Sequence, residues 1–153
     1  MNFKQQTTLN ILYAEDDADD RSFFERALKE ISIVTLLRTV TNGEELMDYL
    51  AKNYEQLPDV LFLDLSMPRK TGFECLGEIK EDKKLKHLPV VVFSTSFTRV
   101  IDFEQSLMNT LFKMGAHHYI RKPGDFEQLK QVIHQALIKT IEIRLPNGQQ
   151  SIN

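Results

Sequence analysis

Short apolar runs alternate with segments of helical spacing along almost the whole chain. Five of these runs predict β-strands: Leu9–Ala14, Val34–Val40, Val60–Asp64, Val90–Phe93 and His118–Ile120. After each run, apolar residues recur at intervals of three and four, which is the pattern of a helix with one buried face. This regular order of strand and helix predicts an α/β fold with a parallel sheet, right-handed crossovers and five helices on both faces.

The polarity of the runs indicates where each strand lies in the sheet. Val60–Leu63 and Val90–Phe93 are entirely apolar, as expected for strands that are covered on both faces. The run Val34–Val40 is more polar, so we place it at an edge of the sheet. Five helices are expected around apolar residues that share a face: Phe23, Phe24, Ala27, Leu28 and Ile31; Leu46, Met47, Leu50 and Ala51; Phe73, Leu76 and Ile79; Leu107, Met108, Leu111 and Phe112, before Gly115; and Phe126, Leu129, Ile133, Ala136 and Leu137.

Length and composition suit one globular domain. The chain has 153 residues, of which 42% are hydrophobic, and its net charge of −3 gives no basic field to attract nucleic acid. No apolar stretch approaches the roughly 20 residues of a membrane span, and the polar start lacks the apolar core of a signal peptide. Cys75 is the single cysteine, so no internal disulfide can form. We therefore expect a cytoplasmic protein that binds neither nucleic acid nor membrane.

Polar side chains stand at the carboxyl ends of the predicted strands, where open parallel sheets bind their ligands. Clustered carboxylates can hold a hard cation such as Mg²⁺, while a lysine and a hydroxyl suit a phosphoryl oxygen. One carboxylate could then act as a nucleophile and form an aspartyl phosphate. The residues are Glu15, Asp16 and Asp17 after the first strand, Asp64 at the end of the third, Ser94 and Thr95 after the fourth, and Lys122 after the fifth.

Asp64 is the best candidate for the nucleophile. It closes an apolar strand by itself, and Pro68 stiffens the turn that follows it. A solitary aspartate, lysine or strand-end serine is usually a structural or solvated residue. The functional interpretation therefore depends on all of these positions occurring together.

The motifs resemble, in content and order, the receiver domain of two-component response regulators, which has the chemotaxis-regulator fold. The resemblance covers about Asn10 to Ile141 and implies a flavodoxin-like strand order, 2-1-3-4-5. It rests on Glu15 to Asp17, Asp64 to Gly72, Ser94 with Thr95, and Tyr119 to Pro123. We expect a receiver domain at residues 8–143 and a short polar tail at 144–153, with no output domain.

The resemblance implies a role for each acidic residue. Asp64 would accept a phosphoryl group from a phosphohistidine. Asp16 and Asp17 would hold Mg²⁺, with Mn²⁺ as the alternative, together with Asp64 and the backbone carbonyl of Ser66. The partners implied are a histidine kinase or phosphotransfer protein, and a downstream protein. The chain would be a monomer or a phosphorylation-linked homodimer.

The resemblance also implies which residues bind phosphate and transmit the signal. Lys122 would pair with Asp64 or its phosphate, Ser94 and Thr95 would lie at the phosphoryl group, and Tyr119 would swing inward. The Lys122–Pro123 peptide bond would be cis. In their residues, the motifs are most similar to those of small stand-alone regulators of the kind paired with phytochrome kinases.

Three departures from the family pattern affect this interpretation. Thr71 stands where an Asp, Asn or Ser is usual, and Thr95 stands where a small alanine is usual. Lys122 follows Ser94 by 28 residues, several more than is usual, and the extra length falls around Phe97 to Asn109. The helix in this region belongs to the signalling surface of the family, so a different output surface is expected.

Two other functions compete with the phospho-acceptor switch. A phosphohydrolase that works through an aspartyl phosphate would usually carry a second Asp two residues after the nucleophile, where this chain has Ser66. An adaptor that is never phosphorylated would not need the acceptor residues, which are all present. We therefore expect a signalling switch that catalyses only its own phosphorylation and dephosphorylation, and not an enzyme.

Overall fold

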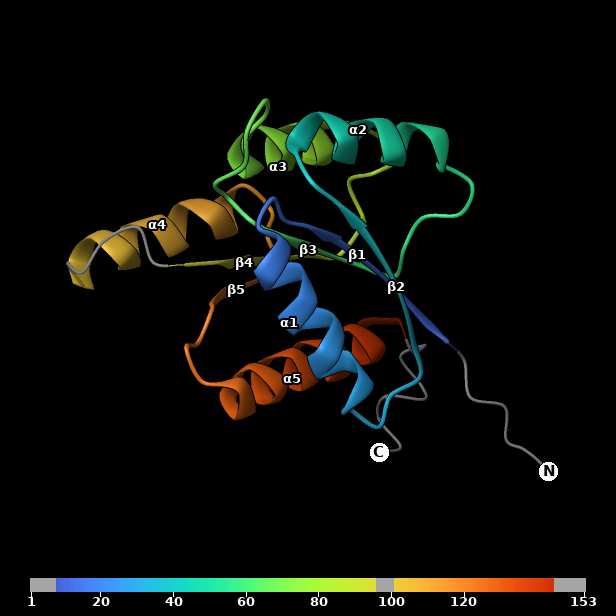
Figure 1. The fold of residues 1–153 in the computed structure, drawn as a ribbon. Helices are drawn as coiled ribbons and strands as arrows, with labels where there is room; N and C mark the ends of the chain where they lie inside the picture. Colours follow the sequence, from blue (N-terminus) through green and yellow to red (C-terminus); the bar gives the residue numbers. More distant parts are fainter. Residues whose placement is uncertain (1–7, 96–100, 145–153) are drawn as a thin grey trace.

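A computed structural model describes residues 8–95 and 101–144, with no side-chain description for 101–103 and 144. The predicted order of strand and helix is confirmed throughout this part of the chain (Figure 1). Residues 96–100, which include the start of the predicted extra length from Phe97 to Asn109, lie outside the described residues, as do residues 145–153 of the predicted tail. The elements are β1 (Leu9–Ala14), α1 (Ala18–Lys29), β2 (Thr35–Val40), α2 (Gly43–Lys52), β3 (Val60–Leu63), α3 (Gly72–Glu81), β4 (Val90–Ser94), α4 (Ile101–Lys113), β5 (His118–Arg121) and α5 (Phe126–Arg144).

The strands form one parallel sheet in the order β2-β1-β3-β4-β5, as predicted. The polar strand β2 lies at one edge and the central strands β3 and β4 are buried on both faces. Strand order reverses direction between β1 and β3, so the carboxyl ends of these strands flank the crevice where such folds bind ligands.

Two hydrophobic cores hold the helices on the two faces of the sheet (Figure 1). On one face, α1 and α5 pack through Phe24, Leu28, Ile133 and Leu137. On the other, α2 and α3 pack through Leu46, Leu50, Leu76 and Ile79, and α4 adds Leu111. Because both faces are covered, the sheet can expose functional groups only at its edges and at the ends of its strands.

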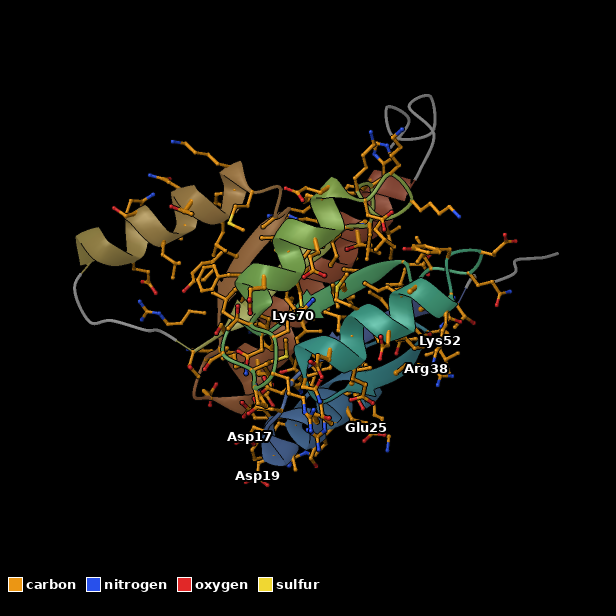
Figure 2. All side chains as sticks on the ribbon, turned by 90° about the horizontal axis from the view of Figure 1, so that it is seen from above. Asp17, Asp19, Glu25, Arg38, Lys52 and Lys70 are labelled. Atoms are coloured by element: carbon orange, nitrogen blue, oxygen red, sulfur yellow. The ribbon has the colours of Figure 1, made fainter. Side chains whose placement is uncertain are left out.

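Helix α4 extends away from the rest of the molecule in both views (Figure 1, Figure 2). Leu111 is buried, whereas Leu107 and Met114 are only partly buried against the core. The helix ends at Lys113, and Gly115 then adopts φ 104°, a left-handed conformation that glycine reaches without a steric penalty. The predicted end of this helix at Gly115 is therefore confirmed.

The loop between β3 and α3 packs closely against the end of β3. Gly72 lies so near that a Cβ atom on it would stand 2.2 Å from the backbone oxygen of Asp64, and its N–H donates to the Leu65 carbonyl at 3.0 Å. Thr71 caps α3 in a capping box with Glu74. The threonine that departs from the family pattern thus has a local role in starting the helix.

The expected cis peptide bond before Pro123 is wrong, because the Lys122–Pro123 bond is trans in this structure. The trans form is the default even before proline, by about 0.5–1 kcal/mol. Among the residues that the structure describes, no helix is both long and apolar enough to cross a membrane.

Candidate functional site

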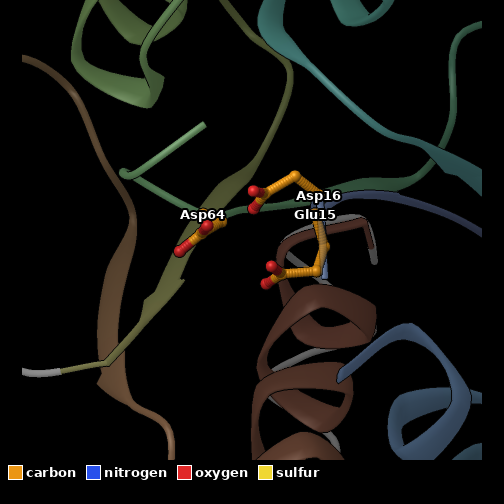
Figure 3. A group of neighbouring side chains, drawn as sticks. All are labelled: Glu15, Asp16 and Asp64. Carbon is orange, nitrogen blue, oxygen red and sulfur yellow. The ribbon is translucent and has the colours of Figure 1, made fainter. Parts of the chain in front are cut away.

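Three carboxylates meet where β1 and β3 end (Figure 3). Ala14 lies opposite Leu63 in the parallel ladder, so the residues that follow them, Glu15 and Asp64, leave the sheet side by side. Each of Glu15, Asp16 and Asp64 offers an oxygen within 4.8 Å of the others. Glu15 and Asp64 are buried and Asp16 is exposed, so the group opens to solvent on one side.

Asp64 is 4% exposed and accepts a hydrogen bond from the Ser94 hydroxyl at 2.9 Å, which brings together two of the predicted site residues. Burial raises the pKa of Asp64, while the charge of Lys122, the Ser94 hydroxyl and a backbone hydrogen bond from Ser66 all act to lower it. These three partners stabilise the ionised form, which is the form that can act as a nucleophile or hold a cation.

Glu15 is the most enclosed acid of the group, at 2% exposed. It accepts hydrogen bonds from the Tyr13 hydroxyl and the Asp17 backbone N–H, both at 3.1 Å, and from the Lys122 ammonium. Burial raises the pKa of Glu15 to about 7, against the opposing effect of its bond with Lys122. Its charge therefore depends on pH close to neutrality.

Lys122 reaches from the end of β5 into the acidic group, and its side chain is 10% exposed. The ammonium contacts Glu15, lies 3.0 Å from Asp20 Oδ2, and lies 3.9 Å from Asp64 Oδ1. Burial acts to lower the pKa of Lys122, but its acidic partners outweigh this effect and the pKa is raised. The predicted pairing with Asp64 is present only as a long ion pair, since Glu15 and Asp20 are the nearer partners.

Asp17, which the resemblance implies as a cation ligand, lies outside the carboxylate group. Its side chain accepts from the Asp20 backbone N–H at 3.0 Å and caps the first turn of α1. Glu15 takes its place beside Asp16 and Asp64. The reason is that β1 ends at Ala14, so the residue adjoining the ladder is Glu15, while the third acid already belongs to the start of the helix.

Tyr119 lies apart from the carboxylates, half-buried on β5. Its hydroxyl donates to Glu104 Oε2 on α4 at 3.2 Å, and Arg121 donates to the same carboxylate through Nε at 3.1 Å. Burial, together with the charge of Glu104, raises the pKa of Tyr119 to about 12. Thr95, by contrast, is exposed at the end of β4.

The sequence placed Glu15 in the acidic cluster, but the resemblance gave the third carboxylate position to Asp17. The contacts of Asp20 with Lys122 and of Glu104 with Tyr119 were not predicted. A signal for Asp20 was present, because it lies in the first turn of α1, three residues after the N-cap Asp17 and close in sequence to the acidic cluster. Glu104 could not have been found in this way. Its contacts depend on where α4 lies relative to β5, which no local pattern fixes.

Comparison with known proteins supplies the family. The model of the response regulator receiver domain matches residues 11–134. The chain is 30% identical over 127 residues to the sensor histidine kinase CheAY of Helicobacter pylori, covering 83% of this chain but only 15% of that protein.

Two solved structures are similar over most of their length. One is the phosphorylated cyanobacterial phytochrome response regulator RcpA, with a TM-score of 0.76 and 31% identity over 91% of this chain and 98% of that one. The other is the Mn²⁺-bound form of response regulator Rcp1, with a TM-score of 0.71 and 28% identity over 83% and 90% of the two chains.

The fold and its acidic rim define a flavodoxin-like α/β domain with its polar groups at the topological switch point. Within that class, the chain belongs to the family of response regulator receiver domains of two-component signalling. Acceptance of a phosphoryl group is the general function of that family.

Proposed function

We propose that Asp64 is the residue that accepts the phosphoryl group, from a phosphohistidine and with a divalent cation. The environment of its carboxylate carries the proposal. It is 4% exposed, accepts a hydrogen bond from Ser94 at 2.9 Å and lies 3.9 Å from Lys122 Nζ. Both neighbours suit a phosphoryl oxygen, because a hydroxyl donates a hydrogen bond and an ammonium balances negative charge.

In the proposed step, an oxygen of the Asp64 carboxylate forms a bond to phosphorus. The bond between phosphorus and the imidazole nitrogen of the donor breaks, and that nitrogen keeps the electron pair and takes a proton from water. The attack requires an ionised Asp64. Lys122 and Ser94 favour this form, since both lower the pKa of Asp64 against the effect of burial.

The cation would be held by Glu15, Asp16 and Asp64, because their oxygens lie within 4.8 Å of one another. Carboxylate oxygens suit Mg²⁺ and Mn²⁺, which need several oxygen ligands and retain water at the remaining positions. When bound, the cation would neutralise charge on the phosphoryl oxygens. The Mn²⁺-bound form of Rcp1 supports a divalent cation here, and the Ser66 carbonyl stays a predicted further ligand.

The phosphoryl donor would be a histidine kinase or a phosphotransfer protein. The similarity to RcpA, which is described as a phytochrome response regulator, favours a kinase of the phytochrome type. We further propose that Tyr119 and the adjoining surface of α4 carry the signal onward, because Tyr119 joins β5 to α4 through Glu104. A homodimer formed on phosphorylation would be one readout of that signal.

Binding of beryllofluoride, a mimic of the phosphoryl group, tests the proposal. Beryllofluoride with Mg²⁺ should bind the wild-type chain at one site, and Asp64→Asn should abolish that binding while the fold is retained. The Asn side chain has nearly the same shape as that of Asp64, so the substitution leaves no cavity. A loss of binding would therefore report the missing charge and carboxylate oxygen. Equal binding by the two chains would overturn the assignment, and rapid multiple turnover of a phosphomonoester would favour a hydrolase instead.

A further inference from the structure

Lys122 is held by a third carboxylate, that of Asp20, which the proposed acceptor chemistry does not use. The ammonium lies 3.0 Å from Asp20 Oδ2 and contacts Glu15, but its 3.9 Å separation from Asp64 Oδ1 exceeds hydrogen-bond length. An ammonium has three N–H donors, and here two of its partners are carboxylates other than the proposed acceptor. Asp64 is therefore the most distant of its three ionic partners in this conformation.

Asp20 is well placed to restrain the ammonium. It lies in the first turn of α1, where its own N–H donates to the Asp17 cap at 3.0 Å. The Lys122 side chain is 10% exposed and that of Asp20 is 36% exposed, so the ion pair stands at the solvent boundary of the site. Asp20 belongs to α1 and Asp64 follows β3, so the two carboxylates draw one ammonium toward different elements.

We infer that Asp20 is a positioning residue that competes with the phosphoryl group for Lys122. This inference rests on the proposed role of Asp64. A phosphoryl group on Asp64 would add negative charge beside Oδ1 and attract the Lys122 ammonium away from Asp20. The contact with Asp20 opposes that movement, because the ammonium gives up a charge-assisted hydrogen bond when it leaves.

Competition and simple structural support predict opposite effects when the Asp20 charge is removed. Under competition, Asp20→Asn frees Lys122 and strengthens binding of a phosphoryl mimic at Asp64. If Asp20 only held the site in shape, the same change would weaken that binding and lower the free energy of unfolding.

The test is the dissociation constant of beryllofluoride at saturating Mg²⁺ for the wild type, Asp20→Asn and Asp19→Asn. Asp19 is exposed in the same helical turn (Figure 2). Asp19→Asn therefore removes the same charge from a side chain that is not among the described ionic partners of Lys122. We expect Asp20→Asn to bind about two- to fivefold more tightly, the range for a partly exposed ion pair, and Asp19→Asn to match the wild type. Asp20→Glu, which restores the carboxylate, should return the dissociation constant toward the wild-type value.

Unchanged or weaker binding by Asp20→Asn would overturn the inference, as would equal tightening by Asp19→Asn or a failure of Asp20→Glu to reverse the effect. These outcomes are distinct from failure of the proposed function. If the wild-type chain did not bind beryllofluoride at Asp64, the proposed function itself would be wrong; if it bound and Asp20→Asn did not change the affinity, only the inference about Asp20 would fail.

Discussion

The Ser94 hydroxyl donates a hydrogen bond of 2.9 Å to Oδ1 of Asp64, the same oxygen that lies 3.9 Å from the Lys122 ammonium. Ser94 ends β4 and Asp64 follows β3, so neighbouring strands supply the donor and the acceptor. One carboxylate oxygen is thus engaged by both phosphate-binding candidates. This arrangement leads to the first prediction.

Ser94→Ala should weaken binding of beryllofluoride and slow labelling by acetyl phosphate, by about ten- to a hundredfold. Hydrogen bonds to charged groups contribute about 1.5–3 kcal/mol, and the buried Asp64 oxygen would lose its donor. Titration of beryllofluoride measures the affinity. Ser94→Thr keeps the hydroxyl and serves as the control; equal affinities for wild type and Ser94→Ala would contradict the proposed contact.

Stability should fall as pH rises through neutrality when no cation is present. Burial raises the pKa of Glu15 to about 7 from 4.5, so the folded state holds a proton that the unfolded state has released. The stabilisation from this proton is complete below pH 4.5 and is lost as pH passes about 7. The loss between pH 5 and 8 should be on the order of 1–3 kcal/mol, and urea unfolding at each pH measures it.

Cation binding should show the opposite dependence on pH. A protonated Glu15 cannot act as a cation ligand, so the affinity for Mg²⁺ should rise as pH increases through about 7. Glu15→Gln should flatten both the stability curve and the affinity curve. A Mg²⁺ affinity that did not change with pH would contradict the assignment of Glu15 to the cation.

Glu104→Ala should loosen the contact between α4 and β5. The Glu104 carboxylate accepts hydrogen bonds from Tyr119 and Arg121, so its removal should make the amides of α4 exchange with solvent about two- to fivefold faster. Hydrogen exchange measured by mass spectrometry reports this change. Gln105→Ala is the matched control, because Gln105 is exposed and its side chain donates a hydrogen bond to Asn109 within the same helix. Equal effects of the two variants would contradict the prediction.

Gly72→Ala should destabilise the domain by several kcal/mol, because the added Cβ would stand 2.2 Å from the Asp64 backbone oxygen. Gly77→Ala in the same helix is the control. It has no atom within 4 Å of the added Cβ and should be neutral or stabilising by up to about 1 kcal/mol. Urea unfolding compares the two, and similar free energies of unfolding would show that the Gly72 contact can relax.

The sequence allowed the fold to be predicted because its signals are local. Entirely apolar runs identify β3 and β4 as central strands, and the spacing around Leu46 and Leu50 identifies a helix with one buried face. The convergence of Asp64, Ser94 and Lys122 at the ends of parallel strands also follows from this pattern, since parallel strands end at one rim.

The parts of the site that could not be predicted depend on the exact residue at which a strand ends, or on contacts between distant parts of the chain. Whether Glu15 or Asp17 joins Asp16 and Asp64 depends on where β1 ends and α1 begins. Such boundaries are the part of a sequence pattern that is hardest to predict. The contact between Lys122 and Asp20 spans 102 residues, and the trans Lys122–Pro123 bond reflects a small energy difference between isomers.

Mapping of the phosphorylated residue tests the central claim most directly. The wild-type chain would be incubated with acetyl phosphate and Mg²⁺, trapped by reduction with borohydride, digested and sequenced by mass spectrometry. Reduction converts an aspartyl phosphate into homoserine, so the account predicts this conversion at position 64 alone, and predicts that Asp64→Asn abolishes it. Conversion at Asp16 or at another acid in the wild type, or an unmodified chain under conditions that label a known receiver domain, would contradict the account.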